Sequence, residues 1–219
     1  MARPRQFNEE ETLAAVRDEF STKGFSATSM DDLMRVTGLG KGSIYAAFGD
    51  KHQIFLSALR LYSGNTLKST HDALSNDKTA IDRLRMLFRV SDHKDAPEPY
   101  RGCFLANSTT ELAVHDCDVR DLSRQTYHSV ENLLGEVVEQ AQNDGDIPRT
   151  VEPPKLGRLL LAVMQGMEFL RKTGMPIQDL RSIGSVTEQL LLPGGDPSQR
   201  AKTTATRVAS SSAKTVKRK

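Results

Sequence analysis

One stretch of the chain, Thr28 to Phe55, constrains the fold more than any other part of the sequence. It reads TSMDDLMRVTGLGKGSIYAAFGDKHQIF and contains two short segments separated by glycine. Ser29 is a suitable N-cap for the first segment, and Gly38 is a suitable stop. The second segment, about Lys41 to Phe48, consists mostly of side chains that are smaller or more polar than those of a typical core helix. Two short helices joined by a tight turn are the layout of a helix-turn-helix, so DNA is the first partner to consider.

The rest of the sequence predicts helices rather than strands. Strand signals are nearly absent, and helical periodicity runs from Asn8 to Leu192 with glycine and proline at the breaks. We expect Asn8 to cap the first helix, Gly24 to end it and Asp50 to cap a longer fourth helix. Further helices are expected at about residues 78–91, 102–114, 118–143, 152–173 and 177–192. The sequence therefore predicts an all-α fold of about nine helices.

This pattern divides the chain into a DNA-binding part and a helical bundle. We expect an N-terminal arm at 1–7, a DNA-binding domain at 8–66 with its motif at about 29–48, a C-terminal bundle at 67–193, and a tail at 194–219. The tail is low in complexity and carries seven basic side chains against one acidic side chain, so it is predicted to be disordered. It either adds sequence-independent affinity for DNA or is an inert, solubilising end, and we favour the first.

Bulk composition narrows the class of protein without naming a partner. The chain has 219 residues, 37% hydrophobic and 26% charged, which is ordinary for a globular protein with a sizeable core. No apolar stretch is long enough to span a membrane, and the N-terminus lacks the apolar segment of a secretion signal. We therefore expect a cytoplasmic protein in which Cys103 and Cys117 are reduced thiols. Net charge is only +2, so an argument for DNA binding depends on where the charges lie.

The second segment of the motif has the composition of a helix that enters a major groove. Ile44 and Phe48 would anchor it from behind, while its outer side stays small or polar so that the backbone approaches base edges. The lysines and the tyrosine of this region would reach phosphates. The hydroxyl and backbone amide groups at the start of the first helix of the motif would do the same. Arg3 and Arg5 form either a minor-groove arm or a merely solvated terminus. The candidate DNA-binding residues are Thr28, Ser29, Lys41, Gly42, Ser43, Tyr45, Ala46, Lys51, Arg3 and Arg5.

The motif resembles the DNA-binding domain of the TetR family of bacterial transcriptional regulators. The resemblance covers about residues 8–62 and rests on Gly24-Phe25, Thr28-Ser29-Met30, Gly38-Leu39, Lys41-Gly42-Ser43-Ile44-Tyr45, Phe48, Lys51 and Phe55. It implies a nine-helix plan with a divergent ligand-binding and dimerisation half. It also implies phosphate contacts from Tyr45, Lys51 and Thr28, and groove-facing positions for Lys41, Gly42, Ser43 and Ala46. None of these can make a bidentate base contact as arginine or asparagine does, so DNA shape is expected to carry part of the specificity.

The C-terminal helices carry more apolar residues than a single core face needs. The stripe from Leu156 to Leu170, with the helix at 177–192, is read either as simple core or as a four-helix interface with a second copy, and we favour the homodimer. A small-molecule pocket would lie in the same half, although plain core packing is the more common role for such residues. The candidate pocket residues are Met86, Phe104, Asn107, Tyr127, Met164 and Phe169.

Other constellations in the sequence do not predict a site. His115, Asp116, Cys117 and Asp118 crowd one turn, but ordinary turn residues are the favoured interpretation over a metal sensor. No dinucleotide fingerprint or catalytic pattern occurs, so we expect no cofactor, no resident metal and no enzyme activity.

We therefore expect a sequence-specific regulator, most simply a repressor that a small-molecule effector releases from a palindromic operator. The alternatives are an architectural DNA-binding protein without an effector and a cysteine- or metal-based sensor of the same kind.

Overall fold

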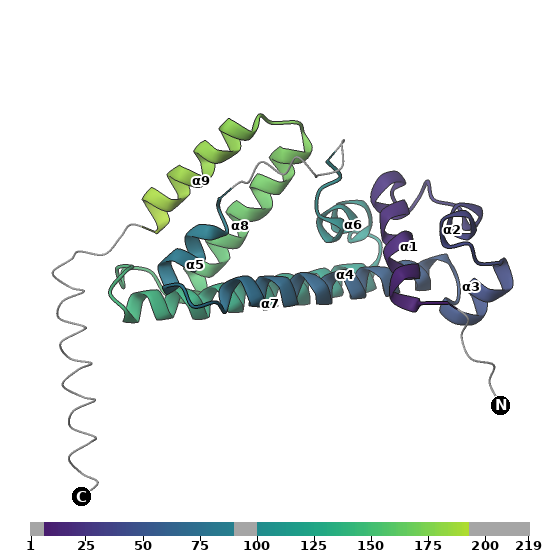
Figure 1. Cartoon of the computed structure of the whole chain (residues 1–219), viewed down its shortest axis with the longest axis horizontal. Helices are drawn as coiled ribbons and strands as arrows, with labels where there is room; N and C mark the ends of the chain where they lie inside the picture. The colour runs from purple at the N-terminus through teal and green to yellow at the C-terminus, as the bar shows by residue number, and fades with distance from the viewer. Residues whose placement is uncertain (1–6, 90–99, 193–219) are drawn as a thin grey trace, which may run out of the picture. The chain divides into compact units, whose positions relative to one another are not determined.

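A computed structural model describes residues 7–89 and 100–192, and within them the chain forms α-helices and no strand. The all-α prediction is confirmed, and most of the observed helices begin and end within two residues of the expected positions. Arg3, Arg5 and the basic tail lie outside the described residues. The helices, labelled in Figure 1, are α1 (Glu9–Lys23), α2 (Met30–Thr37), α3 (Lys41–Phe48), α4 (Lys51–Leu74), α5 (Ala80–Met86), α6 (Phe104–Leu112), α7 (Cys117–Asn143), α8 (Pro153–Lys172) and α9 (Ile177–Leu191).

The chain divides into two compact units, and each unit is made of two segments that are separate in the sequence. The described part of the first unit is residues 7–69 and 100–128, which includes α1–α3, most of α4, α6 and the start of α7. The described part of the second is residues 70–89 and 129–192, which includes α5, the rest of α7, α8 and α9. The boundary expected after residue 66 lies close to residue 69, where the N-terminal segment of the first unit ends. In the structure, α6 belongs to the same unit as the helix-turn-helix.

The expected helix caps form as local hydrogen bonds. The Asn8 side chain accepts from the backbone amides of Glu10 and Glu11, at 3.0 and 3.3 Å. Ser29 and Asp32 form a reciprocal capping box, in which the Ser29 hydroxyl accepts from the Asp32 amide and the Asp32 carboxylate accepts from the Ser29 amide. These bonds satisfy amides that the first turn of a helix leaves without a partner, so they fix where α1 and α2 begin.

The turn between α2 and α3 depends on glycine. Gly38 ends α2 with φ of 67°, a left-handed conformation that side chains with a Cβ atom rarely adopt, and its amide donates to the Met34 carbonyl at 3.0 Å. Gly40 then caps α3 without a side-chain hydrogen bond. The short turn places α3 directly after α2, as expected for a helix-turn-helix.

Aromatic side chains hold the first unit together. Phe55 of α4 packs edge-to-face against Phe20 of α1 and Phe104 of α6, with ring centroids 5.0 and 5.8 Å apart. Phe25 contacts the same ring at 5.0 Å, and Tyr62 packs against Phe104 at 5.7 Å. Phe55 is 1% exposed and Phe104 3%. Because these rings belong to three helices, α6 shares its core with α1 and α4.

The second unit contains a shorter α5 than the sequence predicts. The expected helix at 78–91 is observed only as Ala80–Met86, capped by the Thr79 hydroxyl. Beyond Met86 the backbone tightens, and the Phe88 and Arg89 amides donate to carbonyls three residues earlier. Phe88 is 1% exposed, and its carbonyl faces Gly184 of α9. The segment after Met86 thus packs against α9 where the α-helix ends, a contact that periodicity alone did not show.

Glycines bring α7 and α8 close together within the second unit. A Cβ atom built at Gly157 of α8 would lie 2.8 Å from the Gly135 amide nitrogen and 2.9 Å from the Glu131 carbonyl oxygen of α7. The two backbones therefore touch at this crossing. Leucines such as Leu134 and Leu160, both fully buried, complete the core beside it.

We predict that Gly157→Ala destabilises the protein by roughly 1–3 kcal/mol, because the added methyl group meets backbone atoms that cannot rotate away. Gly64→Ala is the matched control, since a Cβ atom at Gly64 in α4 meets no described atom within 4 Å. That change should raise the unfolding free energy by up to about 1 kcal/mol through helix propensity. Urea denaturation of both variants measures the difference. Equal stability of Gly157→Ala and the parent chain would contradict the close crossing.

Candidate nucleic-acid interface

The helix α3 has one buried side and one open side. Ile44 is fully buried and Phe48 is 8% exposed, so the two predicted anchors are confirmed. Ser43 and Ala46 are exposed, and Tyr45 is 45% exposed, which is high for a tyrosine in a folded domain. An added Cβ atom at Gly42 would meet nothing described within 4 Å. The open side thus presents backbone and small groups, the surface that a major groove can accept.

Charge pairing separates the basic side chains of this unit into two groups. Lys23 contacts Glu19 and Asp32 at 2.8 and 2.5 Å, and Arg35 contacts the same two carboxylates at 2.9 and 3.3 Å. The Lys23 ammonium holds the pKa of Asp32 well below its usual range, with help from hydrogen bonds donated by Ser29. This network joins α1 to α2 and neutralises its own cations, so Lys23 and Arg35 have little positive charge left to offer DNA.

Lys41 and Lys51 lie outside that network. Among the described residues neither forms an ion pair, and each ammonium lies near an aromatic ring instead. The Lys51 nitrogen is 4.5 Å from the centre of the Phe25 ring, and the Lys41 nitrogen is 6.0 Å from that of Tyr45. A ring positions an ammonium without cancelling its charge, so both lysines remain available for phosphate.

The two residues before α2 differ in what they can offer. Thr28 is 1% exposed and its hydroxyl donates to the Gly24 carbonyl at 2.7 Å, so this side chain stabilises the α1–α2 turn. The structure therefore gives the Thr28 hydroxyl another partner than the expected phosphate. Ser29 is exposed, but its hydroxyl belongs to the capping box with Asp32. What this end of α2 retains for an anion is the positive pole of the helix.

The end of α6 contacts the α1–α2 turn through Glu111, a residue that sequence reasoning missed. The Glu111 carboxylate accepts from the Phe25 and Ser26 amides, each at 2.9 Å. Partial burial alone would raise the pKa of Glu111, but these hydrogen bonds and the nearby charge of Lys51 keep it below its ordinary value. Because 85 residues separate Ser26 from Glu111, no local pattern could have revealed the contact.

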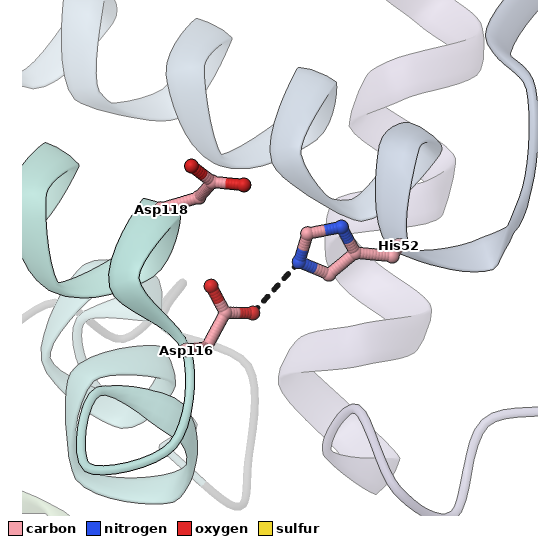
Figure 2. Close-up of side chains that lie close together, drawn as sticks. All are labelled: His52, Asp116 and Asp118. Atoms are coloured by element: carbon pink, nitrogen blue, oxygen red, sulfur yellow. Dashed lines mark hydrogen bonds and ion pairs between the residues drawn. The ribbon is translucent and has the colours of Figure 1, made fainter.

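The turn between α6 and α7 contacts the start of α4. Asp116 accepts from the Val119 amide through Oδ1 at 3.1 Å, and its Oδ2 lies 2.7 Å from Nε2 of His52. The dashed line in Figure 2 marks the contact with His52. Burial would raise the pKa of Asp116, but the Val119 amide and His52 outweigh it and keep the pKa low. His115 and Cys117, two other residues that the sequence places in this turn, are both exposed.

The candidate pocket residues are divided between the two units. Phe104 is buried beside Tyr62, and Cys103, the N-cap of α6, accepts from the Tyr62 hydroxyl at 3.6 Å. Burial raises the pKa of both Tyr62 and Tyr127, with the Cys103 thiol a further cause in each. Tyr62, Cys103 and Tyr127 are half-buried and pack against the core of the first unit, whereas the Asn107 amide, one turn along α6, donates to the Arg101 carbonyl at 2.8 Å.

The remaining candidate pocket residues lie in the second unit. Met164 is half-buried, but Met86 and Phe169 are exposed, Phe169 by 67%. The side chains of Met86 and Phe169 therefore do not line the interior of that unit. Helical periodicity placed them correctly on helices and could not show which side of each helix is covered.

Comparisons with known proteins decide the family. Residues 13–58 match the model of bacterial regulatory proteins of the tetR family, and residues 80–176 match a tetracyclin repressor-like C-terminal domain. The chain belongs to the TetR family. It is a DNA-binding transcriptional regulator.

Relatives and solved structures agree with this assignment. The HTH-type transcriptional repressor ComR of Escherichia coli K12 is 26% identical over 194 residues, which cover 86% of this chain and 90% of ComR. The repressor BdcR of the same organism is 31% identical over 135 residues, 60% of this chain and 66% of BdcR.

The fold of this TetR-family regulator resembles that of the reduced form of E. coli NemR, with a TM-score of 0.76, 17% identity and coverage of 86% of this chain and 99% of NemR. It also resembles a cysteine mutant of the TetR family regulator CifR complexed with 26bp double-strand operator DNA, with a TM-score of 0.71, 23% identity and coverage of 86% and 99%. Among the described residues, no helix is long and apolar enough to cross a membrane.

We predict that Lys51→Ala weakens binding to every duplex and lowers the slope of log affinity against log salt by about 1, because one phosphate contact is lost. Lys155→Ala is the control, since Lys155 is exposed in α8 and pairs with Glu152. Ser43→Asn should instead change the preferred base sequence with little change in the salt slope. Fluorescence anisotropy at several salt concentrations measures both. Identical effects of Lys51→Ala and Ser43→Asn on all duplexes would contradict the division of roles.

Proposed function

We propose that this regulator is a repressor that binds a palindromic operator as a homodimer and leaves it when an effector binds. The open side of α3, flanked by the unpaired charges of Lys41 and Lys51, is the observation that carries the DNA-binding role. The names of ComR and BdcR, both repressors, support repression rather than activation. A protein with this role works in the cytoplasm, where bacterial DNA is.

Exposed apolar residues on α8 and α9 support a dimer. Leu190 is 73% exposed, Phe169 67%, Val186 48% and Leu159 45%. Large side chains of this kind on neighbouring helices are costly to leave in water, and a second copy of the same chain would cover them. A dimer would also present two copies of α3 to two half-sites, roughly 34 Å or one duplex turn apart.

The polar cluster at the start of α6 is the proposed effector site. Tyr62 and Tyr127 offer hydroxyl groups near the Cys103 thiol, Tyr62 also packs on the Phe104 ring, and Asn107 adds an amide one turn along α6, a mixture suited to a small organic molecule. A second candidate function is a cysteine-based sensor, in which the same regulator responds through one of its thiols instead of a bound effector. The hydrogen bond from Tyr62 favours Cys103 over the exposed Cys117 for that role.

The helix α6 connects the proposed effector site to the DNA-binding residues. Cys103 caps its first turn, and Glu111 near its last turn binds the Phe25 and Ser26 amides. These two positions are roughly 12 Å apart along a helix that rises 1.5 Å per residue. A ligand that favours a different position of α6 would therefore move the α1–α2 turn as well, and it would shift DNA binding by its differential affinity for the two positions.

The proposed function predicts a strong preference for one palindrome. Purified full-length protein should bind a duplex from its own upstream region at least 10³-fold more tightly than a scrambled duplex, as specific binders do. Destroying one half-site should reduce the affinity sharply, because both copies of α3 contribute in a dimer. Anisotropy titrations at fixed salt measure the ratios. A ratio near one for every duplex, with genome-wide occupancy that shows no preferred sites, would favour an architectural protein instead.

We predict that Glu111→Ala lowers this specificity ratio roughly tenfold, because the α1–α2 turn loses two hydrogen bonds to a charged group. Glu111→Gln should have a smaller effect, since the amide oxygen still accepts one hydrogen bond. Comparing the two variants distinguishes loss of the hydrogen bonds from loss of the negative charge near Lys51. Loss of the charge alone would raise the affinity for all duplexes equally in both variants. Faster hydrogen exchange of the Phe25 and Ser26 amides in Glu111→Ala would locate the change. Unaltered exchange and specificity would exclude this role for Glu111.

The sign of the pKa shift fixes the pH range in which the Glu111 contact acts. The folded-state pKa of Glu111 lies below its ordinary value of 4.5, so the contact contributes its full stabilisation above that value. The contribution is lost only as the pH falls through the lower folded-state pKa. Effects of Glu111→Ala should therefore be constant around neutral pH.

A further inference from the structure

We propose that His52, Asp116 and Asp118 form a binding site for one divalent metal ion of the Zn²⁺ or Co²⁺ type. One imidazole nitrogen and one oxygen from each carboxylate all lie within 4.8 Å of one another. The residues come from two segments far apart in the chain, the start of α4 and the turn that opens α7. Figure 2 shows the imidazole and both carboxylates directed toward a common space.

The donor types suit such an ion. Zn²⁺ and its neighbours in the first transition series bind imidazole nitrogen and carboxylate oxygen, at about 2.0–2.2 Å for Zn²⁺. A neutral imidazole and two ionised carboxylates together carry two negative charges, which a divalent cation neutralises. Ligand atoms around a tetrahedral ion lie roughly 3.3 Å apart, by the geometry of such bonds. Side-chain rotations that move the donor atoms by about 1 Å would change the distances between them from their present values to that value.

The existing hydrogen bonds leave the needed donor atoms available. Oδ1 of Asp116 accepts from the Val119 amide and keeps the N-cap of α7, while Oδ2 faces His52 at 2.7 Å. A metal ion would replace the proton shared by that oxygen and the imidazole. The Asp118 carboxylate is exposed, and no hydrogen bond or ion pair to another described residue engages it. It is therefore free to turn toward the ion.

Exposure gives an ion access and leaves room for water ligands. The His52 side chain is 37% exposed and that of Asp116 17%, so the site is open on one side. Three protein ligands and at least one water would complete the coordination. A bound ion would hold the first turn of α4 to the α6–α7 turn with bonds stronger than the present hydrogen bond. The site stands independently of the proposed effector mechanism, because it depends only on these three side chains.

The test is a Co²⁺ titration of the full-length protein, followed by visible absorption, with Zn²⁺ added in competition. We expect one Co²⁺ per chain and displacement by Zn²⁺. Asp118→Asn should weaken binding at least tenfold without affecting the fold, since this carboxylate forms no hydrogen bond or ion pair with a described residue. His52→Gln should weaken it similarly. Zn²⁺ should also raise the Tm of the parent chain but not that of Asp118→Asn.

Matched controls exclude other ligands in the same turn. Asp121→Asn removes an exposed carboxylate one turn along α7 that pairs with Arg124, and His115→Gln removes a neighbouring imidazole. Both should bind Co²⁺ like the parent chain. Cys117→Ser should also leave binding unchanged, and no thiolate charge-transfer band should appear. Absence of binding at millimolar Co²⁺, equal affinity of Asp118→Asn and the parent chain, or dependence on Cys117 would each overturn the proposal.

Discussion

The packing of Phe55 against rings from α1 and α6 is the interaction on which the first unit depends. Phe55 contacts Phe20, Phe25 and Phe104 with centroids 5.0–5.8 Å apart, and it is 1% exposed. Through this ring, the helix that follows the recognition helix shares one core with α6. Because close-packed interiors transmit strain, we expect a displacement of α6 to alter the packing of α1 and α4 as well.

Polar contacts add direction to that shared core. Glu111 binds the α1–α2 turn, and Asp116 binds His52 at the start of α4. Both carboxylates come from the end of α6 or the turn after it. Glu111 contacts the turn that precedes α2, and Asp116 contacts the first turn of α4, which follows α3.

The charges of the DNA-binding unit are arranged by pairing more than by number. Residues 1–60 contain equal numbers of basic and acidic side chains, yet Lys23 and Arg35 form ion pairs while Lys41 and Lys51 form none with any residue that the structure describes. The unpaired lysines flank the open side of α3. Local positive charge therefore lies beside the surface that is small enough to enter a groove, although residues 1–60 have a net charge of zero.

The sequence by itself determined the helices, their caps and the motif. Asn8, Ser29 and Gly38 act through bonds that span four residues or fewer, and Ile44 and Phe48 follow the periodicity of one helix. Such local signals are readable because the partners are neighbours in the chain. The family resemblance came from the same short stretch.

Only the tertiary structure decided which distant residues meet. Glu111 contacts Ser26 across 85 positions and Asp116 contacts His52 across 64, so their pairing depends on how whole helices pack. The same holds for the buried Thr28 hydroxyl, the exposed Phe169 and the early end of α5 at Met86. Sequence periodicity states which residues share a face of a helix. It does not state what covers that face, because that depends on chain segments remote in sequence.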